Sequence, residues 1–299
     1  MRSAVTNLAM APKPPILQPT QIRKIALTAI AADDVLFQRL VLKGGNALEL
    51  VHGIGQRASF DLDFSIEGDL EEPAEIGRRI ERALGDRFDA AGVLVFDFKF
   101  EPRPQTTRPG HNPAWGGYNA TFKLISRERW KALGDKLDRK RVEALTTGDG
   151  QERVYSIEIS KYEYCEGKTT ASIDEYTIYV YTPTMIAAEK LRAICQQMKE
   201  YPQRRHPTPR PRDFYDIWAI VSERSVDLRT QPNLELLKRM FEVKQVGWDL
   251  LLNIARDTVF HATGWDQVRL ATRGELNEFA FYAQFISQLA QELHALGVE

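Results

Sequence analysis

Alternation of apolar and polar residues predicts a series of β-strands in the first part of the chain. The clearest case is the stretch 59–66, in which Phe60, Leu62, Phe64 and Ile66 alternate with Ser59, Asp61, Asp63 and Ser65. Successive side chains of a strand point to opposite faces, so this strand has one apolar face and one wholly polar face. Shorter stretches of the same kind predict strands at 93–100, 118–126, 154–160 and 176–181.

Apolar residues spaced three and four positions apart predict helices in the same region. One such pattern covers residues 20–50, where a short apolar run precedes Gly44 and Gly45, and another covers 71–88. The first part of the chain therefore combines strands with helices.

The pattern changes after the last predicted strand. Thr182 and Pro183 are typical of a helix N-cap and a first helical residue. The remainder is mostly helical, apart from a loop at 201–212. We therefore predict an α/β (α+β) protein, with a mixed sheet and flanking helices in residues 1–181 and a helical C-terminal domain in residues 182–299.

Composition and charge exclude several classes of protein. The net charge of the 299 residues is −1, so overall charge does not indicate a nucleic-acid partner. The two cysteines, Cys165 and Cys195, lack metal-type spacing and fit a reducing compartment. No run of about 18 apolar residues is present, and the N-terminus is a poor signal peptide. We expect a cytoplasmic protein without a membrane partner.

Asp61 and Asp63 are the first candidates for chemistry. Carboxylates at positions i and i+2 of a strand lie about 6–7 Å apart, given a rise of ~3.3 Å per residue. Both can reach one divalent cation or a pair of cations, and Mg²⁺ prefers such hard oxygen ligands. Glu158, on a polar strand face, would extend the set if its strand lies adjacent. The alternatives are a solvent-exposed strand face and a surface glutamate, and they stay open.

Gly44 and Gly45 stand before a predicted helix. A glycine turn lets backbone N–H groups approach phosphate oxygens, and a helix N-terminus adds a favourable dipole. An ordinary strand-to-helix turn is the alternative. The polar strand that follows favours a site with phosphates on the glycine turn and a metal ion on the aspartates.

The helical part contributes a second group of candidates. Lys190 interrupts the apolar face of its helix, either as a lysine at the edge of the stripe or as an ammonium directed at a phosphate. Glu189 and Arg192 look like ordinary polar-face residues. Asp213 and Asp216 lie three apart at the start of another helix, beside its apolar stripe.

The loop between these helices is basic. It contains no acidic residue and four arginines, which are Arg204, Arg205, Arg210 and Arg212. Such a loop is either a solvated linker or a binding site for the phosphates of a nucleotide or an RNA backbone.

Together the segments "KGGNALEL", "RASFDLDF", "EKLRAI" and "RDFYDIW", in this order, resemble the AbiEii/AbiGii nucleotidyltransferase toxin family, which includes the MenT-type toxins. The resemblance implies the DNA polymerase β-like nucleotidyltransferase fold. Its first motif falls on Gly44, Gly45, Ser59, Asp61 and Asp63, its lysine on Lys190 and its late aspartate on Asp213. Many nucleotidyltransferases have serine or threonine after the glycines, whereas this chain has Asn46, which is still able to bond phosphate.

The resemblance implies a toxin of an AbiE-like, type IV toxin–antitoxin system. Such an enzyme uses Mg²⁺ or Mn²⁺ to transfer a nucleoside monophosphate from an NTP to an RNA acceptor, the tRNA 3′ end being expected. This blocks translation, can act in phage defence and implies an antitoxin of the AbiEi kind. We assign catalysis to Asp61, Asp63, Lys190 and Asp213, the metal ion to Asp61, Asp63 and Glu158, and RNA to the four loop arginines. Nucleotide binding is assigned to Lys43, Gly44, Gly45, Asn46, Arg57, Ser59, Lys190 and Asp216.

Two other functions remain open. One is an enzyme of the same fold that modifies a protein or a small molecule. The other is a non-catalytic module that binds nucleotide or RNA, against which the intact set of Asp61, Asp63 and Lys190 argues. The loop 102–117 matches no motif.

Overall fold

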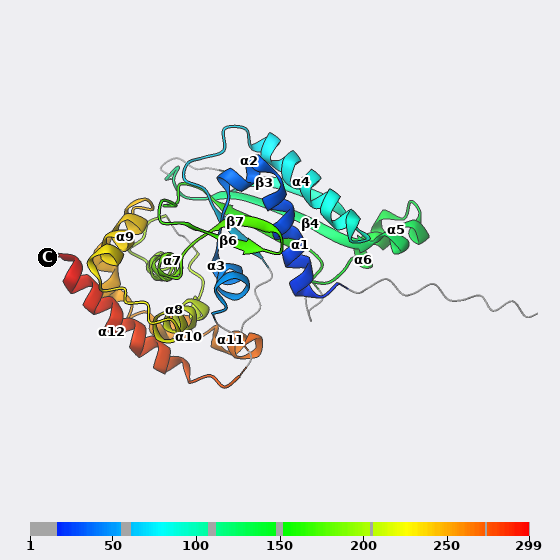
Figure 1. Cartoon of the computed structure of the whole chain (residues 1–299). Coiled ribbons are helices and arrows are strands. Elements are labelled where there is room, and N and C mark those ends of the chain that lie inside the picture. The colour runs from blue at the N-terminus through cyan, green and yellow to red at the C-terminus, as the bar shows by residue number, and fades with distance from the viewer. Residues whose placement is uncertain are drawn as a thin grey trace, which may run out of the picture.

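A seven-stranded mixed sheet forms the centre of the protein, with the strand order β3-β4-β5-β2-β1-β7-β6. The structure, a computed structural model, describes residues 17–54, 61–106, 112–147, 152–203, 206–272 and 274–298. Helices of the C-terminal part gather beside the sheet, as Figure 1 shows. The predicted α/β class, a mixed sheet with helices followed by a helical part, is confirmed.

The sheet contains both parallel and antiparallel pairs. β1 is antiparallel to β2 and parallel to β7, and β2 is parallel to β5. The strands are β1 Val41–Lys43, β2 Leu62–Ser65, β3 Val93–Arg103, β4 Gly117–Ser126, β5 Tyr155–Ser160, β6 Thr169–Ile173 and β7 Tyr176–Val180. The predicted polar strand is thus a central strand of the sheet; on its polar face Ser65 is fully buried, Asp63 is half-buried and Asp61 is exposed.

The strand register brings polar residues of three strands into one row. Lys43 of β1 lies opposite Asp63 of β2, and Asp63 lies beside Glu158 of β5. Because paired residues of neighbouring strands point to the same face, these three side chains share one surface. The predicted proximity of Glu158 to the aspartates is confirmed.

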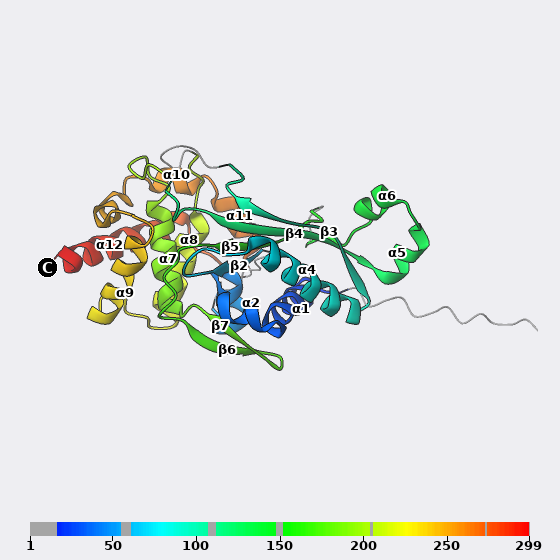
Figure 2. The same cartoon turned by 90° about the horizontal axis from the view of Figure 1, so that it is seen from above.

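Helices cover the sheet and form the C-terminal part (Figures 1 and 2). α1, α2 and α4 pack on one another, and α4 places Ile76, Ile80, Leu84 and Phe88 in the core. The helices are α1 Pro19–Ala32, α2 Asp34–Arg39, α3 Gly44–Asn46, α4 Pro73–Ala90, α5 Arg127–Leu133, α6 Leu137–Val142, α7 Pro183–Cys195, α8 Pro211–Glu223, α9 Gln231–Glu242, α10 Thr258–Ala262, α11 Trp265–Ala271 and α12 Phe279–Val298, with a π-helix η1 at Ala47–His52 and a 3-10 helix η2 at Trp248–Asn253.

α7 begins where the sequence predicts. The Thr182 hydroxyl accepts a hydrogen bond from the Met185 N–H at 3.3 Å, and Pro183 is the first helical residue. α8 and α9 pack against α7, and most of its residues are buried. Charged side chains on α7 are therefore held inside the protein and need partners there.

One hydrophobic cluster runs through both parts of the chain. It includes Leu27 of α1, Leu42 of β1, Leu191 of α7 and Leu289 of α12. The boundary at residue 181 falls between β7 and α7, and the division into two domains stays a prediction. Of the helices in the described ranges, none has the length and apolar character to cross a membrane.

The structure corrects several element boundaries. The predicted strand at 93–100 continues to Arg103, after an irregularity between Phe96 and Lys99, so the predicted loop 102–117 is shorter. β6 was not predicted because it is an edge strand with Ile173 as its one buried residue. The first helix pattern is divided at Asp33, whose carboxylate caps α2.

Candidate active site

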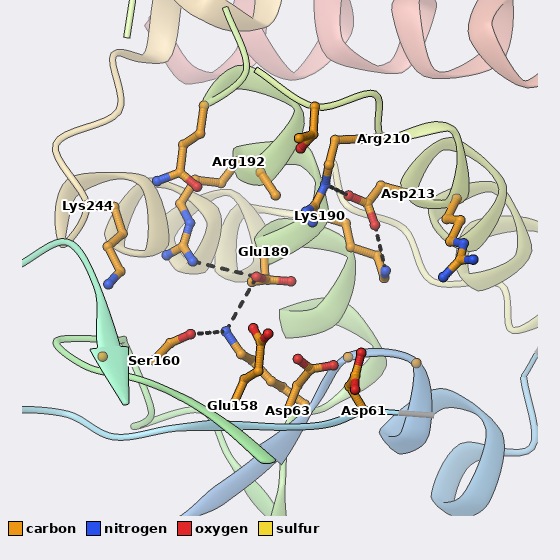
Figure 3. Close-up of a pocket in the computed structure, with 18 of the residues that line it drawn as sticks. Asp61, Asp63, Glu158, Ser160, Glu189, Lys190, Arg192, Arg210, Asp213 and Lys244 are labelled. Atoms are coloured by element: carbon orange, nitrogen blue, oxygen red, sulfur yellow. Dashed lines mark hydrogen bonds and ion pairs between the residues drawn. The ribbon is translucent and has the colours of Figure 1, made fainter. Parts of the chain in front are cut away.

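Three carboxylates line one wall of a cavity of about 960 Å³. Asp63 comes from the start of β2, Asp61 lies directly before this strand, and Glu158 comes from β5. Figure 3 shows all three on the side of the cavity that faces Lys190 and Asp213 of the helical part. The guanidinium of Arg103, which also lines the cavity, forms an ion pair with Glu158.

The protein environment makes these carboxylates difficult to ionise together. Burial is the main cause that raises the pKa of Asp63 to about 7, and Glu158, Glu189 and Asp61 add to this rise although Lys43 opposes it. Burial, followed by Glu158, also raises the pKa of Asp61. Carboxyl groups in such a state bind a cation favourably, because the cation offsets both the desolvation and the mutual repulsion.

Replacing Asp63 with asparagine is expected to stabilise the metal-free protein at alkaline pH while removing its activity. The unfolded chain releases this proton near pH 3.8 and the folded protein near pH 7, so the wild type loses stability as the pH rises through this window. Asparagine cannot ionise, so the variant does not lose this stability. Each pH unit of the window adds about 1.4 kcal/mol to the difference in unfolding free energy between the variant and the wild type. Urea unfolding with EDTA at pH 4 and pH 8 measures this difference.

The free-energy difference between Asp63→Asn and the wild type should grow from pH 4 to pH 7 and then stay constant. Asp138→Asn is the matched control, since the Asp138 side chain is 95% exposed on α6. A difference that does not change with pH would mean that Asp63 is not held in its protonated form.

The glycine turn fits closely against Asp63. Gly44 has a φ of +69°, and a Cβ atom built there would lie 2.5 Å from Asp63 Oδ2. The left-handed conformation disfavours any other residue, and the short distance leaves no room for a side chain. Gly44 therefore allows the turn and the metal-ligand candidate to lie in contact.

Gly44→Ala is expected to reduce activity by about 100-fold, because the new methyl group displaces the Asp63 carboxylate. It should also lower the free energy of unfolding by ~1–2 kcal/mol, because alanine disfavours the left-handed backbone conformation at this position. Gly92→Ala is the control. Gly92 has a φ of +76°, and a Cβ atom there would meet nothing within 4 Å. Unfolding and transfer assays on both variants separate backbone strain from the clash; equal activity in the two would contradict the proposed contact.

A buried ionic network lies beside the carboxylates. The Lys43 ammonium lies 3.1 Å from the Ser160 hydroxyl and 3.5 Å from a Glu189 oxygen. Glu163 pairs with Arg192 at 2.9 Å and with Lys244 at 3.4 Å. Lys43 thus lines the cavity, where a phosphate contact is predicted for it, and its ammonium is also paired with Glu189 and, at 3.7 Å, with Glu163.

The interpretation of Glu189 and Arg192 as ordinary polar-face residues is wrong. The Arg192 side chain is 2% exposed, and both residues line the cavity. Burial alone would raise the pKa of Glu163, yet Arg192, Lys43 and Lys244 lower it to about 2. Glu163 and Lys244 were not predicted at all, because neither belongs to a recognisable pattern in the sequence.

Lys190 is the centre of a second ionic cluster. Its ammonium lies 2.8 Å from Asp213 Oδ1 and 2.8 Å from Asp216 Oδ2. Arg210 Nε donates to the other oxygen of Asp213 at 2.5 Å. The Lys190 side chain is 7% exposed, so the alternative of a lysine at the edge of an apolar stripe is wrong.

Not every predicted residue contacts the cavity. Gly45, Asp213, Arg210 and Arg212 line it with the residues above. Within the described chain, its lining does not include Asn46 or Asp216, which lie behind Asp61 and Lys190 respectively. The structure thus places these two residues outside the cavity lining, and their nucleotide contacts stay predictions. Arg57, Ser59, Arg204 and Arg205 lie outside the described residues.

The residues present fit a divalent cation that arrives with a phosphate group. Among the described residues, no three carboxylate, histidine or cysteine side chains form a ready metal cage. Mg²⁺ is often bound by one or two carboxylates and completed by substrate phosphates and water. Asp61 and Asp63 supply two such ligands, whereas Glu158 would first have to leave Arg103.

Comparison with known proteins identifies the family of the chain. The profile of a family described as nucleotidyl transferase AbiEii toxin, type IV toxin–antitoxin system, matches residues 25–296. A solved structure of a nucleotidyltransferase candidate from H. pylori covers 94% of this chain and 95% of its own, with 17% identity and a TM-score of 0.48. An antigenic nucleotidyltransferase-like protein from Paracoccidioides brasiliensis covers 75% and 93%, with 15% identity and a TM-score of 0.35.

No curated protein matches the chain at a significant level. The family profile, in contrast, spans most of the chain and includes both the carboxylates of the sheet and the lysine of α7. The protein therefore belongs to the AbiEii toxin family, the nucleotidyltransferases of type IV toxin–antitoxin systems.

Proposed function

We propose that this toxin transfers a nucleoside monophosphate from an NTP to an RNA acceptor, the 3′ end of tRNA being the expected target. The observation that carries the proposal is the pair of carboxyl groups with raised pKa values, Asp61 and Asp63, which line the same cavity as Lys190 and face it. A nucleotidyl transfer needs groups that hold a cation and groups that neutralise phosphate charge around one cavity.

Asp61 and Asp63 would hold Mg²⁺ or Mn²⁺, with Glu158 as a further ligand once Arg103 is released. When bound, such an ion activates the acceptor hydroxyl and offsets charge at the α-phosphate. Gly44 and Gly45 let the backbone approach the remaining phosphates.

The helical part supplies positive charge to the leaving group. Although burial opposes it, Asp213 and Asp216 raise the pKa of Lys190 far above neutral pH, so this ammonium stays charged. Asp213 also holds Arg210, whose side chain is partly exposed to the cavity. We assign Lys190 and Arg210 to the departing pyrophosphate and Asp213 to their orientation.

An RNA acceptor is supported by the arginines around the cavity. Arg103, Arg210 and Arg212 line it, and although Arg103 pairs with Glu158 and Arg210 with Asp213, guanidinium groups of this kind are suited to contact a polynucleotide backbone. The family implies an antitoxin partner, for which we propose a protein of the AbiEi kind. We also propose that the toxin acts in the cytoplasm and contributes to phage defence.

The acceptor and the metal ion are tested together by incubating purified protein with total RNA, one α-labelled NTP at a time, and Mg²⁺, Mn²⁺ or EDTA. Label in tRNA-sized RNA that disappears with EDTA is the expected result. Label in protein or in a small molecule would keep the chemistry and replace the acceptor. If NTP binds but no label is transferred under any condition, the protein is a binding module or needs a partner.

A further inference from the structure

A buried chain of hydrogen bonds connects α1 to Asp61. Arg23 of α1 donates from Nη1 to Asn46 Oδ1 at 2.9 Å. Asn46 then donates from Nδ2 to the backbone carbonyl of Asp61 at 2.6 Å. Arg23 and Asn46 are both buried, and Asn46 is completely inaccessible to solvent. Neither residue lines the cavity, so this chain of bonds acts on the site from behind.

Asp61 needs such a contact because the sheet does not hold it. β2 begins at Leu62, and its pairing starts at Asp63 with β1 and at Leu62 with β5. The carbonyl of Asp61 therefore lies just beyond the strand ladder, where the Asn46 side chain binds it. Asn46 ends the short helix that starts at Gly44, so one side chain joins the glycine turn to the carboxylate wall.

The amide of Asn46 satisfies both neighbours. The Arg23 guanidinium cannot accept a hydrogen bond, so it must face the amide oxygen, which directs the NH₂ group at Asp61. Glu49 fixes Arg23 in turn, with hydrogen bonds of 2.6 Å and 3.1 Å to its two terminal nitrogens. An aspartate at position 46 would keep the bond to Arg23. Its second oxygen would face the Asp61 carbonyl, and because both atoms are acceptors, the hydrogen bond to Asp61 would be lost.

We propose that Arg23 and Asn46 are positioning residues that set the location of the Asp61 carboxylate and thereby its affinity for a divalent cation. The inference rests on the proposed function, in which Asp61 is a metal ligand. Partners that orient a ligand from outside the metal shell are typically worth ~10–100-fold in affinity or activity.

The test uses the full-length protein and measures Mn²⁺ binding by titration calorimetry, independently of any acceptor. Asn46→Asp keeps the shape of the side chain and is expected to weaken Mn²⁺ binding by about 10-fold or more, with a similar loss in kcat and little change in the KM for NTP. Arg23→Gln, a second variant, should give a smaller loss in the same direction. Lys24→Gln is the matched control. It removes the same charge from α1 as Arg23→Gln, but Lys24 pairs with Asp174 on an exposed surface.

Asp61→Ala separates failure of this inference from failure of the proposed function. If Asp61→Ala weakens Mn²⁺ binding and both Asn46→Asp and Arg23→Gln leave it unchanged, the positioning role is wrong and the site assignment stands. If none of the three changes Mn²⁺ binding, Asp61 is not a ligand and both conclusions are overturned. Unfolding midpoints confirm that each variant is folded at the assay temperature.

Discussion

Cells that express the Asp61→Asn variant are expected to grow normally, whereas expression of the wild-type toxin arrests growth. Asparagine has nearly the shape of aspartate but no negative charge, so the cation would lose one of its two principal ligands. We expect nucleotide transfer to fall by more than about 10³-fold, since even residues that merely orient a ligand are worth ~10–100-fold. Growth curves after tightly controlled induction, with immunoblots for protein level, provide the measurement.

Asp138→Asn serves as the control for this growth experiment. It makes the same chemical change on α6, where the side chain is 95% exposed, and it should arrest growth as the wild type does. Growth arrest by Asp61→Asn at a wild-type protein level would remove Asp61 from the catalytic assignment.

The largest loss of stability is expected from Lys190→Met. Methionine fills a similar volume, but it leaves Asp213 and Asp216 buried without the ammonium that lies 2.8 Å from each. Removing one partner of a buried ion pair typically costs about 3–5 kcal/mol, and activity should disappear with the charge. Urea unfolding at pH 7 measures the loss. The control Lys24→Met breaks an exposed ion pair on α1 and should change the free energy of unfolding little.

The Lys190→Met effect should depend on pH. Burial by itself would raise the pKa of Asp213, but Arg210 and Lys190 together lower it well below its usual range. A lowered pKa contributes stability above the unfolded pKa of 3.8, and this stability is lost as the pH falls below that value. The wild type and Lys190→Met should therefore become more similar in stability at pH 3 than at pH 7. An equal difference at both pH values would mean that Asp213 does not depend on Lys190.

Part of the arrangement of the candidate site was predictable from the sequence, because it depends on local pattern, whereas the chemical roles of its residues stay predictions. Strict alternation placed Asp61 and Asp63 on one face of a strand, and the cap at Thr182 placed the start of α7. The glycine turn was also visible, although its contact with Asp63 was not. That contact depends on the pairing of Lys43 with Asp63, and the register between β1 and β2 cannot be predicted from either segment alone.

The buried ionic network was missed for a physical reason. Arg192 is buried and Glu189 is only partly exposed because α8 and α9 pack against α7, and a helix covered in this way cannot be treated as half exposed. A signal was present, since the segment from Met185 to Cys195 carries apolar residues around most of its circumference. A helix of this kind is typically buried, and each charge on it then requires a partner.

Asn46 shows a different limit of the sequence. Its place after the glycines suggested a phosphate contact, whereas its side chain points to the Asp61 carbonyl and to Arg23. Arg23 is 23 residues away and lies on a helix whose pattern indicates only an apolar face. Long-range hydrogen bonds of this kind depend on the packing of the whole core and have no local signature.

The most direct test of the central claim is a comparison of α-labelled and γ-labelled NTP in one reaction with total RNA and Mg²⁺. If Asp61 and Asp63 support nucleotidyl transfer, the α-label will appear in the acceptor, the γ-label will appear in pyrophosphate, and both will be absent with Asp61→Asn. Transfer of the γ-label to the acceptor, or undiminished transfer of the α-label by Asp61→Asn, would contradict the account.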